Sequence, residues 1–264
     1  MNLTGGFIQV AASASPAEGA YRPAVLIPVY DHEEAIGPTL SQVLQHDCPV
    51  MLVDDGSGET CRQRLLQLRE QHSQRVSLLR LEVNGGKGAA VKAGLMALME
   101  QGYSHAIQLD ADGQHEISDL PRFLAASKAS PTHLVSGYPQ YDNVPWIRYY
   151  ARYLTHVWIW INTLSFEIRD TMCGFRVYPL AAVTEMLARE PCGDRMEFDP
   201  EVMVRWSWRG GRVVNLPIRV NYPIDGVSHF NLWKDNLLIS WMHTRLFFGM
   251  LYRLPVILWR KLNG

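Results

Sequence analysis

The sequence has few cysteines and almost no net charge, and both shortages narrow the possible classes of protein. Its 264 residues include four cysteines, and no two of them form a C-x-x-C pair. This pattern argues against a zinc site or a disulfide framework and fits a reducing compartment. A formal net charge of −1 provides no general attraction for nucleic acid, so we expect no nucleic-acid partner.

A long apolar run is also missing. A helix that spans a membrane needs about 20 mostly apolar residues. The uncharged stretch from Tyr153 to Phe166 is shorter and contains His, Asn, Thr and Ser, so we predict no transmembrane helix. Residues 1–23 lack a basic segment followed by an apolar core, and we expect a mobile tail there rather than a signal peptide.

What the sequence does contain is an alternation of short β-rich runs and amphipathic segments. Strand-like runs begin at residues 24, 49, 76, 105 and 133, and apolar residues with helical spacing lie between them. This order predicts an α/β domain over residues 24–226, with a mostly parallel sheet flanked by helices. Ligands of such sheets bind beyond the carboxyl ends of the strands.

The first candidate site is the D-x-D stretch at the end of the fourth strand. Asp110 and Asp112 flank one residue, and carboxylates at this spacing can face one Mg²⁺ or Mn²⁺ ion from a tight turn. Gln114 can add a carbonyl oxygen and His115 a nitrogen. The alternative is a solvated turn between a strand and a loop, which is common for a lone D-x-D.

Polar residues follow other strands as well. Asp54 and Asp55 end the second strand, where they can meet a base or a ribose, or cap a turn. Lys87 lies in the glycine turn NGGKG ahead of a helix, which favours an anion but is not a Walker A loop; an ordinary turn is the alternative. The stretches RDTMCGFRVYPL and RMEFDPEV place Arg176 and Asp199 as further candidates, for ligand binding or for packing and solvation.

Taken together and in this order, six stretches resemble the family 2 glycosyltransferases, which have the nucleotide-sugar-binding GT-A fold. The nearest likeness is to the polyprenyl-phosphate and dolichyl-phosphate mannose and glucose synthases, and it covers about residues 24–230. The matching stretches are VLIPVYDHEEAI, LVDDGSGE, NGGKGAAVKAGL, LDADGQH, DTMCGFRVY and EFDPEV. The resemblance implies a Rossmann-like GT-A sheet.

On the donor side, the resemblance implies contacts with a UDP- or GDP-sugar. Pro28, Tyr30 and Glu33 would line the nucleotide pocket, with Glu33 near the base or ribose. Asp54 would hydrogen-bond the base, with Asp55 nearby.

Four further residues would complete the donor side. Lys87 would contact the nucleotide, and Asp110 would lie beside the ribose and the metal. Asp112 would bind Mg²⁺ or Mn²⁺, with Gln114 as a second ligand.

On the acceptor side, the resemblance implies that Asp170, Gly174 and Arg176 shape the site for the sugar and the acceptor. A hydroxyl acceptor needs a general base, and Asp199 is the candidate, whereas a phosphate acceptor needs none.

The chain departs from the lipid-phosphate synthases in the stretch NYPIDGVSHF. Pro223 stands where they have an Arg, and Ser228–His229 replaces Ser-Lys. Arg219 or His229 are the candidates to replace the lost cation.

The resemblance therefore predicts an inverting, metal-dependent hexosyltransferase that uses a lipid-linked or membrane-associated acceptor. Residues 227–264 are expected to form amphipathic, membrane-facing helices, because Trp and Tyr favour the bilayer interface and Lys and Arg attract anionic head groups. With residues 146–168 they would hold the protein on the cytoplasmic face of a membrane, or form a dimer face instead. A non-catalytic nucleotide-binding scaffold and a nucleotidyltransferase are the alternative functions.

Overall fold

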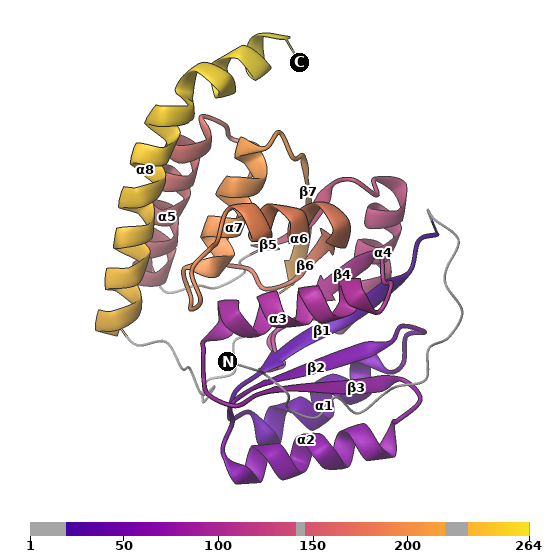
Figure 1. Ribbon diagram of the computed structural model, residues 1–264. Coiled ribbons are helices and arrows are strands. Elements are labelled where there is room, and N and C mark those ends of the chain that lie inside the picture. The colour runs from indigo at the N-terminus through magenta and orange to yellow at the C-terminus, as the bar shows by residue number, and fades with distance from the viewer. Residues whose placement is uncertain (1–19, 141–145, 220–231, 264) are drawn as a thin grey trace, which may run out of the picture.

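A seven-stranded sheet lies at the centre of the computed structural model, which describes residues 20–140, 146–219 and 232–263 (Figure 1). Its strand order is β3-β2-β1-β4-β6-β5-β7, and only β6 runs antiparallel to its neighbours among these residues. The predicted mostly parallel α/β sheet is thus confirmed. The strands are β1 (Pro23–Val29), β2 (Val50–Asp55), β3 (Val76–Leu81), β4 (His105–Gln108), β5 (Leu134–Gln140), β6 (Arg176–Pro179) and β7 (Val213–Arg219).

Helices cover both faces of the sheet, so its strands are buried on both sides. One apolar cluster joins the sheet to α1 (Glu33–Val43), α2 (Glu59–Gln71) and α4 (Leu120–Ala129), which follows the short helix η1 (Ile117–Asp119). The opposite face is covered by α3 (Lys87–Glu100), α6 (Leu180–Arg189) and α7 (Phe198–Trp208). In Figure 1, α3 and the pair α1 and α2 lie on opposite sides of β1–β3.

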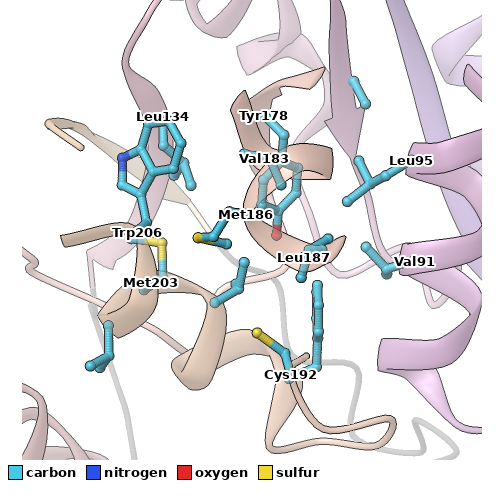
Figure 2. Close-up of a cluster of buried hydrophobic side chains, with 14 of the residues drawn as sticks. Val91, Leu95, Leu134, Tyr178, Val183, Met186, Leu187, Cys192, Met203 and Trp206 are labelled. Carbon is cyan, nitrogen blue, oxygen red and sulfur yellow. The ribbon is translucent and has the colours of Figure 1, made fainter. Parts of the chain in front are cut away.

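On the face that α3, α6 and α7 cover, a second apolar cluster joins α3 to the later pair α6 and α7. Figure 2 shows Met186 of α6 between Val91 and Leu95 of α3 on one side and Met203 and Trp206 of α7 on the other. All five side chains are buried. This packing fixes α7 against α3, so the residues at the beginnings of these two helices have fixed relative positions.

The second half of the chain contains elements that the sequence did not predict. Strand β6 lies within RDTMCGFRVYPL and helix α7 begins within RMEFDPEV, two stretches considered only as candidate sites for ligand binding or catalysis, and α6 lies between them. Strand β7 forms the edge of the sheet beside β5. Residues 1–19 of the expected mobile tail and residues 220–231, which include Pro223 and His229, lie outside the described residues.

Two long helices lie side by side beyond α7 (Figure 1): α5 (Trp146–Thr163) and α8 (Leu232–Asn263). Arg245 and Arg253 of α8 pair with Glu201 and Glu190, and Lys261 donates to the Leu164 carbonyl. Across the described ranges, neither these helices nor any other is long and apolar enough to cross a membrane. The basic side chains thus hold α8 to the protein.

His243 of α8 is buried at the contact between α8 and α5. Its ring stacks on Trp158, with 5.9 Å between ring centroids, and neither ring nitrogen has a hydrogen-bond partner among the described residues. Burial lowers the pKa of His243 from 6.5 to about 4, because the charged ring would lose its hydration. The unfolded chain therefore binds this proton more tightly than the folded chain does.

We expect His243 to make the protein less stable as the pH falls from 6.5 towards 4, with no effect above that range. The wild type should lose roughly 2–3 kcal/mol more of its free energy of unfolding than His243→Phe between about pH 7 and pH 4.5. Urea unfolding at both pH values measures this difference. Replacing the exposed His72 with Gln is the control, and equal losses for wild type and His243→Phe would contradict the prediction.

Candidate functional site

The candidate site lies beyond the end of β4. The antiparallel strand β6 places Arg176 beside this end of β4. The register places Gln108 directly opposite Arg176 and Ala106 opposite Tyr178. Side chains two residues apart on a strand point to the same face, so Arg176 and Tyr178 share the face of Gln108. The Tyr178 hydroxyl donates to Gln108 Oε1 at 2.9 Å.

Lys87 joins two carboxylates that are far apart in the sequence. Its Nζ lies 2.7 Å from Asp110 Oδ1 and 2.9 Å from Asp199 Oδ2. Lys87 begins α3, Asp110 follows β4, and Asp199 lies in the first turn of α7. Three separate elements therefore meet at one ammonium group.

At Lys87 and Asp110, attraction between opposite charges outweighs the cost of burying these groups. Burial alone would lower the pKa of Lys87, but the charges of Asp110 and Asp199 raise it above its ordinary value. Burial would likewise raise the pKa of Asp110, yet Lys87 and His115 hold it well below its usual range. Lys87 and Asp110 are thus both charged at neutral pH.

Arg176 gives Asp199 a second cation. The Arg176 side chain is fully buried; its Nη1 lies 3.2 Å from Asp199 Oδ1 and donates to the Asp199 carbonyl at 2.9 Å. Its Nη2 donates to the Thr171 carbonyl at 2.5 Å. Because Lys87 pairs with the other oxygen, each oxygen of the Asp199 carboxylate faces a positive charge. Asp199 therefore has no oxygen left without a cation.

Asp112 lies beside this cluster on the turn that follows β4. Its Oδ1 accepts a hydrogen bond from the Gln114 backbone N–H at 3.0 Å, and His115 Nε2 lies 3.4 Å from Asp110 Oδ2. Burial, followed by repulsion from Asp110, raises the pKa of Asp112. A bound cation would relieve this repulsion.

The residues present fit a divalent cation that is shared with a substrate. Asp112 and Asp110 offer the carboxylate oxygens that Mg²⁺ and Mn²⁺ prefer. Within the described part of the chain, no three His, Cys, Asp or Glu side chains are grouped to hold a metal ion without other ligands. Magnesium is commonly bound by one or two carboxylates, with substrate phosphates and water completing its coordination.

Asp170 and Gly174 belong to a turn that packs closely against Asp110. Asp170 Oδ1 accepts the N–H groups of Met172 and Cys173 at 2.8 and 2.7 Å, and its Oδ2 lies 3.2 Å from His156 Nε2. These contacts fix the turn that leads to Gly174. A Cβ atom at Gly174 would lie only 2.1 Å from Asp110 Oδ2, so the turn can pass Asp110 only with glycine there.

The two carboxylates that end β2 hold turns. Asp54 is fully buried; its Oδ1 accepts the Ser57 N–H at 2.8 Å, and its Oδ2 pairs with Arg80. Asp55 accepts the N–H groups of Gly85 and Gly86, each at 2.8 Å. The N–H groups of the glycine turn that seemed suited to an anion are thus bound to Asp55.

The remaining sequence candidates lie at the edges of the site. Pro28 belongs to β1, while Tyr30 follows it and Glu33 begins α1, and all three are partly exposed near the carboxyl end of β1. Arg219 ends β7 and lines an open cavity of about 350 Å³ that also borders η1 and the start of α4. The other residues that line the cavity are Glu116, Ser118, Asp119, Arg122, Gln140, Pro217 and Ile218.

The structure therefore brings together Lys87, Asp110, Asp199 and Arg176, with Asp112 beside them. Sequence reasoning did not find the roles of Gln108, Tyr178 and His156. A signal existed for the first two, because polar residues at alternate positions of an apolar strand share one face. No local pattern marked His156, which meets Asp170 only after α5 packs on the turn.

This arrangement of a mostly parallel sheet with acidic side chains at its strand ends is that of a GT-A glycosyltransferase domain. The family model for glycosyl transferase family 2 matches residues 24–190. The chain belongs to this family.

Sequence relatives agree with this assignment. The chain is 30% identical over 173 residues to a polyprenol monophosphomannose synthase of Mycolicibacterium smegmatis, covering 60% of this chain and 61% of the relative. It is 26% identical to a dolichyl-phosphate beta-glucosyltransferase of Mus musculus, covering 68% and 61%. The chain thus spans about three fifths of the length of both. An uncharacterized protein of Methanocaldococcus jannaschii is 26% identical and covered over 92% of its length, with 79% of this chain.

Solved structures show the same fold at lower identity. The glucosyl-3-phosphoglycerate synthase of Mycobacterium tuberculosis superposes with a TM-score of 0.58 at 17% identity, covering 88% of this chain and 80% of that one. A mannosyltransferase of Pyrobaculum calidifontis, solved with GDP-Man and Mn²⁺, gives a TM-score of 0.51 at 15% identity, covering 83% and 62%.

We expect Gly174→Ala to disrupt the Lys87 cluster while the sheet remains folded. The added methyl group would force Asp110 or the turn to move, and misplacement by about 1 Å of a group that binds substrate can reduce turnover about 10²-fold. A crystal structure of the variant would show the distance from Lys87 Nζ to Asp110 Oδ1. Ala182→Gly, on the exposed side of α6, is the control, and an unchanged distance in Gly174→Ala would contradict the prediction.

Proposed function

We propose that this family 2 glycosyltransferase transfers a hexosyl group from a nucleoside diphosphate sugar to a lipid-linked phosphate. Family membership supports transfer of a sugar, and the names of relatives include polyprenol and dolichyl-phosphate compounds. The single observation that favours a phosphate acceptor is the pairing of Asp199 with both Lys87 and Arg176.

A general base must offer an open oxygen to the proton of the acceptor. Each oxygen of the Asp199 carboxylate is already paired with a cation, Oδ2 with Lys87 and Oδ1 with Arg176. A hydroxyl acceptor would need a base without such pairing, whereas a phosphate monoester is already anionic and can attack the anomeric carbon directly. In this proposal Asp199 holds Lys87 in place and takes no proton.

The donor would bind beyond the carboxyl ends of β1, β2 and β4. Pro28, Tyr30 and Glu33 would meet the nucleotide, and Lys87 would place a fixed positive charge near its diphosphate. Asp112, with Gln114 as a second ligand, would hold Mg²⁺ or Mn²⁺, which would supply positive charge for the departing diphosphate. A mannosyltransferase structure with GDP-Man and Mn²⁺ supports this choice of metal.

The acceptor would approach from the side of β5, β6 and β7. Attack from the face opposite the leaving diphosphate gives inversion at the anomeric carbon. Arg219 lines the cavity that borders η1, and we propose that it meets the acceptor phosphate. Arg219 would then take the role of the Arg that the lipid-phosphate synthases have where this chain has Pro223.

A transfer assay tests the function. Purified protein with Mn²⁺ and a panel of UDP- and GDP-sugars should glycosylate a polyprenyl phosphate but not the polyprenol of equal chain length. Asp112→Asn should lose turnover by about 10²–10⁴-fold, because an amide binds a hard cation more weakly. Mn²⁺ binding in the presence of nucleotide, followed by electron paramagnetic resonance, should weaken in the same variant.

Glu70→Gln, which changes an exposed acid on α2 away from the site, is the control and should keep both turnover and Mn²⁺ binding. Equal transfer to the polyprenol would overturn the assignment of a phosphate acceptor. No sugar transfer from any donor, with release of pyrophosphate from a nucleoside triphosphate, would favour a nucleotidyltransferase. No reaction of either kind would favour a scaffold.

The outer face of α8 carries exposed apolar side chains, and we propose that it attaches the protein to a membrane surface. Apolar side chains on this face are more than a third exposed and recur every three or four residues, or at sums of these steps. Trp and Tyr among them favour the lipid interface, and the relatives' names include lipid phosphates. The exposed residues are Trp233, Leu237, Trp241, Phe248, Leu251, Tyr252, Val256, Leu258, Trp259 and Leu262.

Basic residues contribute less to this surface than the sequence suggested. Arg245 and Arg253 face Glu201 and Glu190, and Arg260 donates to the Trp208 carbonyl at 2.5 Å. We therefore propose that α8 rests peripherally on lipid mainly through its aromatic and aliphatic side chains.

Replacing Trp233, Trp241 and Trp259 together with Gln should abolish flotation of the full-length protein with liposomes, because the buried apolar area is lost. Wild-type protein should float with zwitterionic vesicles nearly as well as with anionic ones. Val83→Ser with Met96→Gln and Met99→Gln, which changes exposed apolar residues away from α8, is the control. Unchanged flotation of the triple Trp variant would contradict the proposal, and loss of a dimer in that variant would identify a second copy as the occupant of this face.

A further inference from the structure

The segment 190–197, between α6 and α7, packs against the first turn of α3. The Asp194 carbonyl accepts the Ala89 N–H at 2.8 Å. Lys92 Nζ donates to the Cys192 carbonyl at 2.8 Å and lies 2.5 Å from Asp194 Oδ1. A Cβ atom at Gly88 would lie 2.8 Å from the Gly193 carbonyl oxygen, so the two backbones touch closely. The position of this segment thus determines where α3 begins, and Lys87 is the first residue of α3.

The other side of the segment is held by a buried carboxylate. Glu201 is fully buried, and its Oε2 accepts the Gly193 N–H at 2.8 Å and lies 3.2 Å from Arg245 Nη2. Its Oε1 accepts hydrogen bonds from Arg205 at 2.7 and 3.0 Å. A buried carboxylate is stable only when it is fully paired. Losing Arg245 would therefore weaken the hold of Glu201 on Gly193.

These contacts form a continuous path from α8 to the candidate site. Arg245 lies on α8, and Glu201 lies in the first turn of α7, two residues after Asp199. Gly193 and Asp194 connect Glu201 to the first turn of α3 and to Lys87. Glu201 thus acts on the helix beginnings that carry Lys87 and Asp199.

We propose that Glu201, held by Arg245 of α8, is a positioning residue that sets Lys87 between Asp110 and Asp199. The inference rests on the proposed function, because it assigns these residues a part in sugar transfer. Neither residue touches Lys87 directly. Their effect is geometric, since a reacting group displaced by about 1 Å can lose a large part of its rate advantage.

Arg245→Gln tests the proposal with little risk to folding, because the Arg245 side chain is 38% exposed. Amide hydrogen exchange should speed up by about tenfold at Gly193 and Ala89, where the hydrogen bonds depend on the segment. In the transfer assay kcat should fall about tenfold, while KM for the sugar nucleotide stays within about twofold. Arg245→Lys keeps the charge and should restore most of both.

Arg260→Gln is the matched control, because Arg260 also joins α8 to α7 but donates to the Trp208 carbonyl, away from the segment. It should lower the melting temperature as Arg245→Gln does, yet leave exchange at Gly193 and Ala89 unchanged. If Arg245→Gln and Arg260→Gln change amide exchange or kcat equally, the cause is a general loss of packing between α8 and the protein. That result would overturn the proposal.

Glu201→Gln is a second test of the proposal, because it changes the carboxylate itself. It should give the same pattern as Arg245→Gln, with a larger effect, because the amide pairs weakly with both Arg205 and Arg245. Amide exchange needs no substrate. If the wild type transfers no sugar, the proposed function fails, while the exchange rates still decide whether Glu201 and Arg245 control the start of α3.

Discussion

The structure depends on one ammonium group placed between two carboxylates. Lys87 comes from the beginning of α3, Asp110 from the end of β4 and Asp199 from the first turn of α7, and each is largely withdrawn from water. Charges in such a place are stable only when they are paired, so the three elements must meet in one arrangement. Arg176 adds a second cation to Asp199 and ties β6 to the same point. A site built in this way is rigid before any substrate arrives, which suits electrostatic stabilisation of a leaving group.

This constraint extends well beyond the site. Glycine at position 174 lets the turn after Asp170 pass close to Asp110, and the segment 190–197 holds the start of α3. That segment is fixed in turn by Glu201 and, through Arg245, by α8. The helix with the exposed aromatic face therefore shares contacts with the helices that carry Lys87 and Asp199. Attachment to a lipid surface and the geometry of the site can be linked through this one set of ion pairs.

Much of the fold could be predicted because it depends on local patterns. Apolar runs ended by Asp, Gly and Ser predicted five of the strands, and the position of Asp110 and Asp112 at a strand end followed from them. Strand β6 could not be predicted, since four residues carry too little pattern and its antiparallel direction comes from pairing with β4 and β5. The roles expected for Asp54 and Asp55 remain predictions, and the structure adds that both carboxylates hold turns.

By itself, the sequence determined the α/β class, the alternation of strands and helices from β1 to β5, and the acidic turn beside the sheet, because periodicity and turn residues act over short distances. Only the tertiary structure decided which charges meet. The distance between Lys87 and Asp199 depends on α6 packing between α3 and α7. The inward direction of Arg245 depends on the buried Glu201 of α7, and that of Arg253 on Glu190 in the loop after α6. The paired residues are far apart in the sequence. No local pattern records their contact, because it arises only when the core closes.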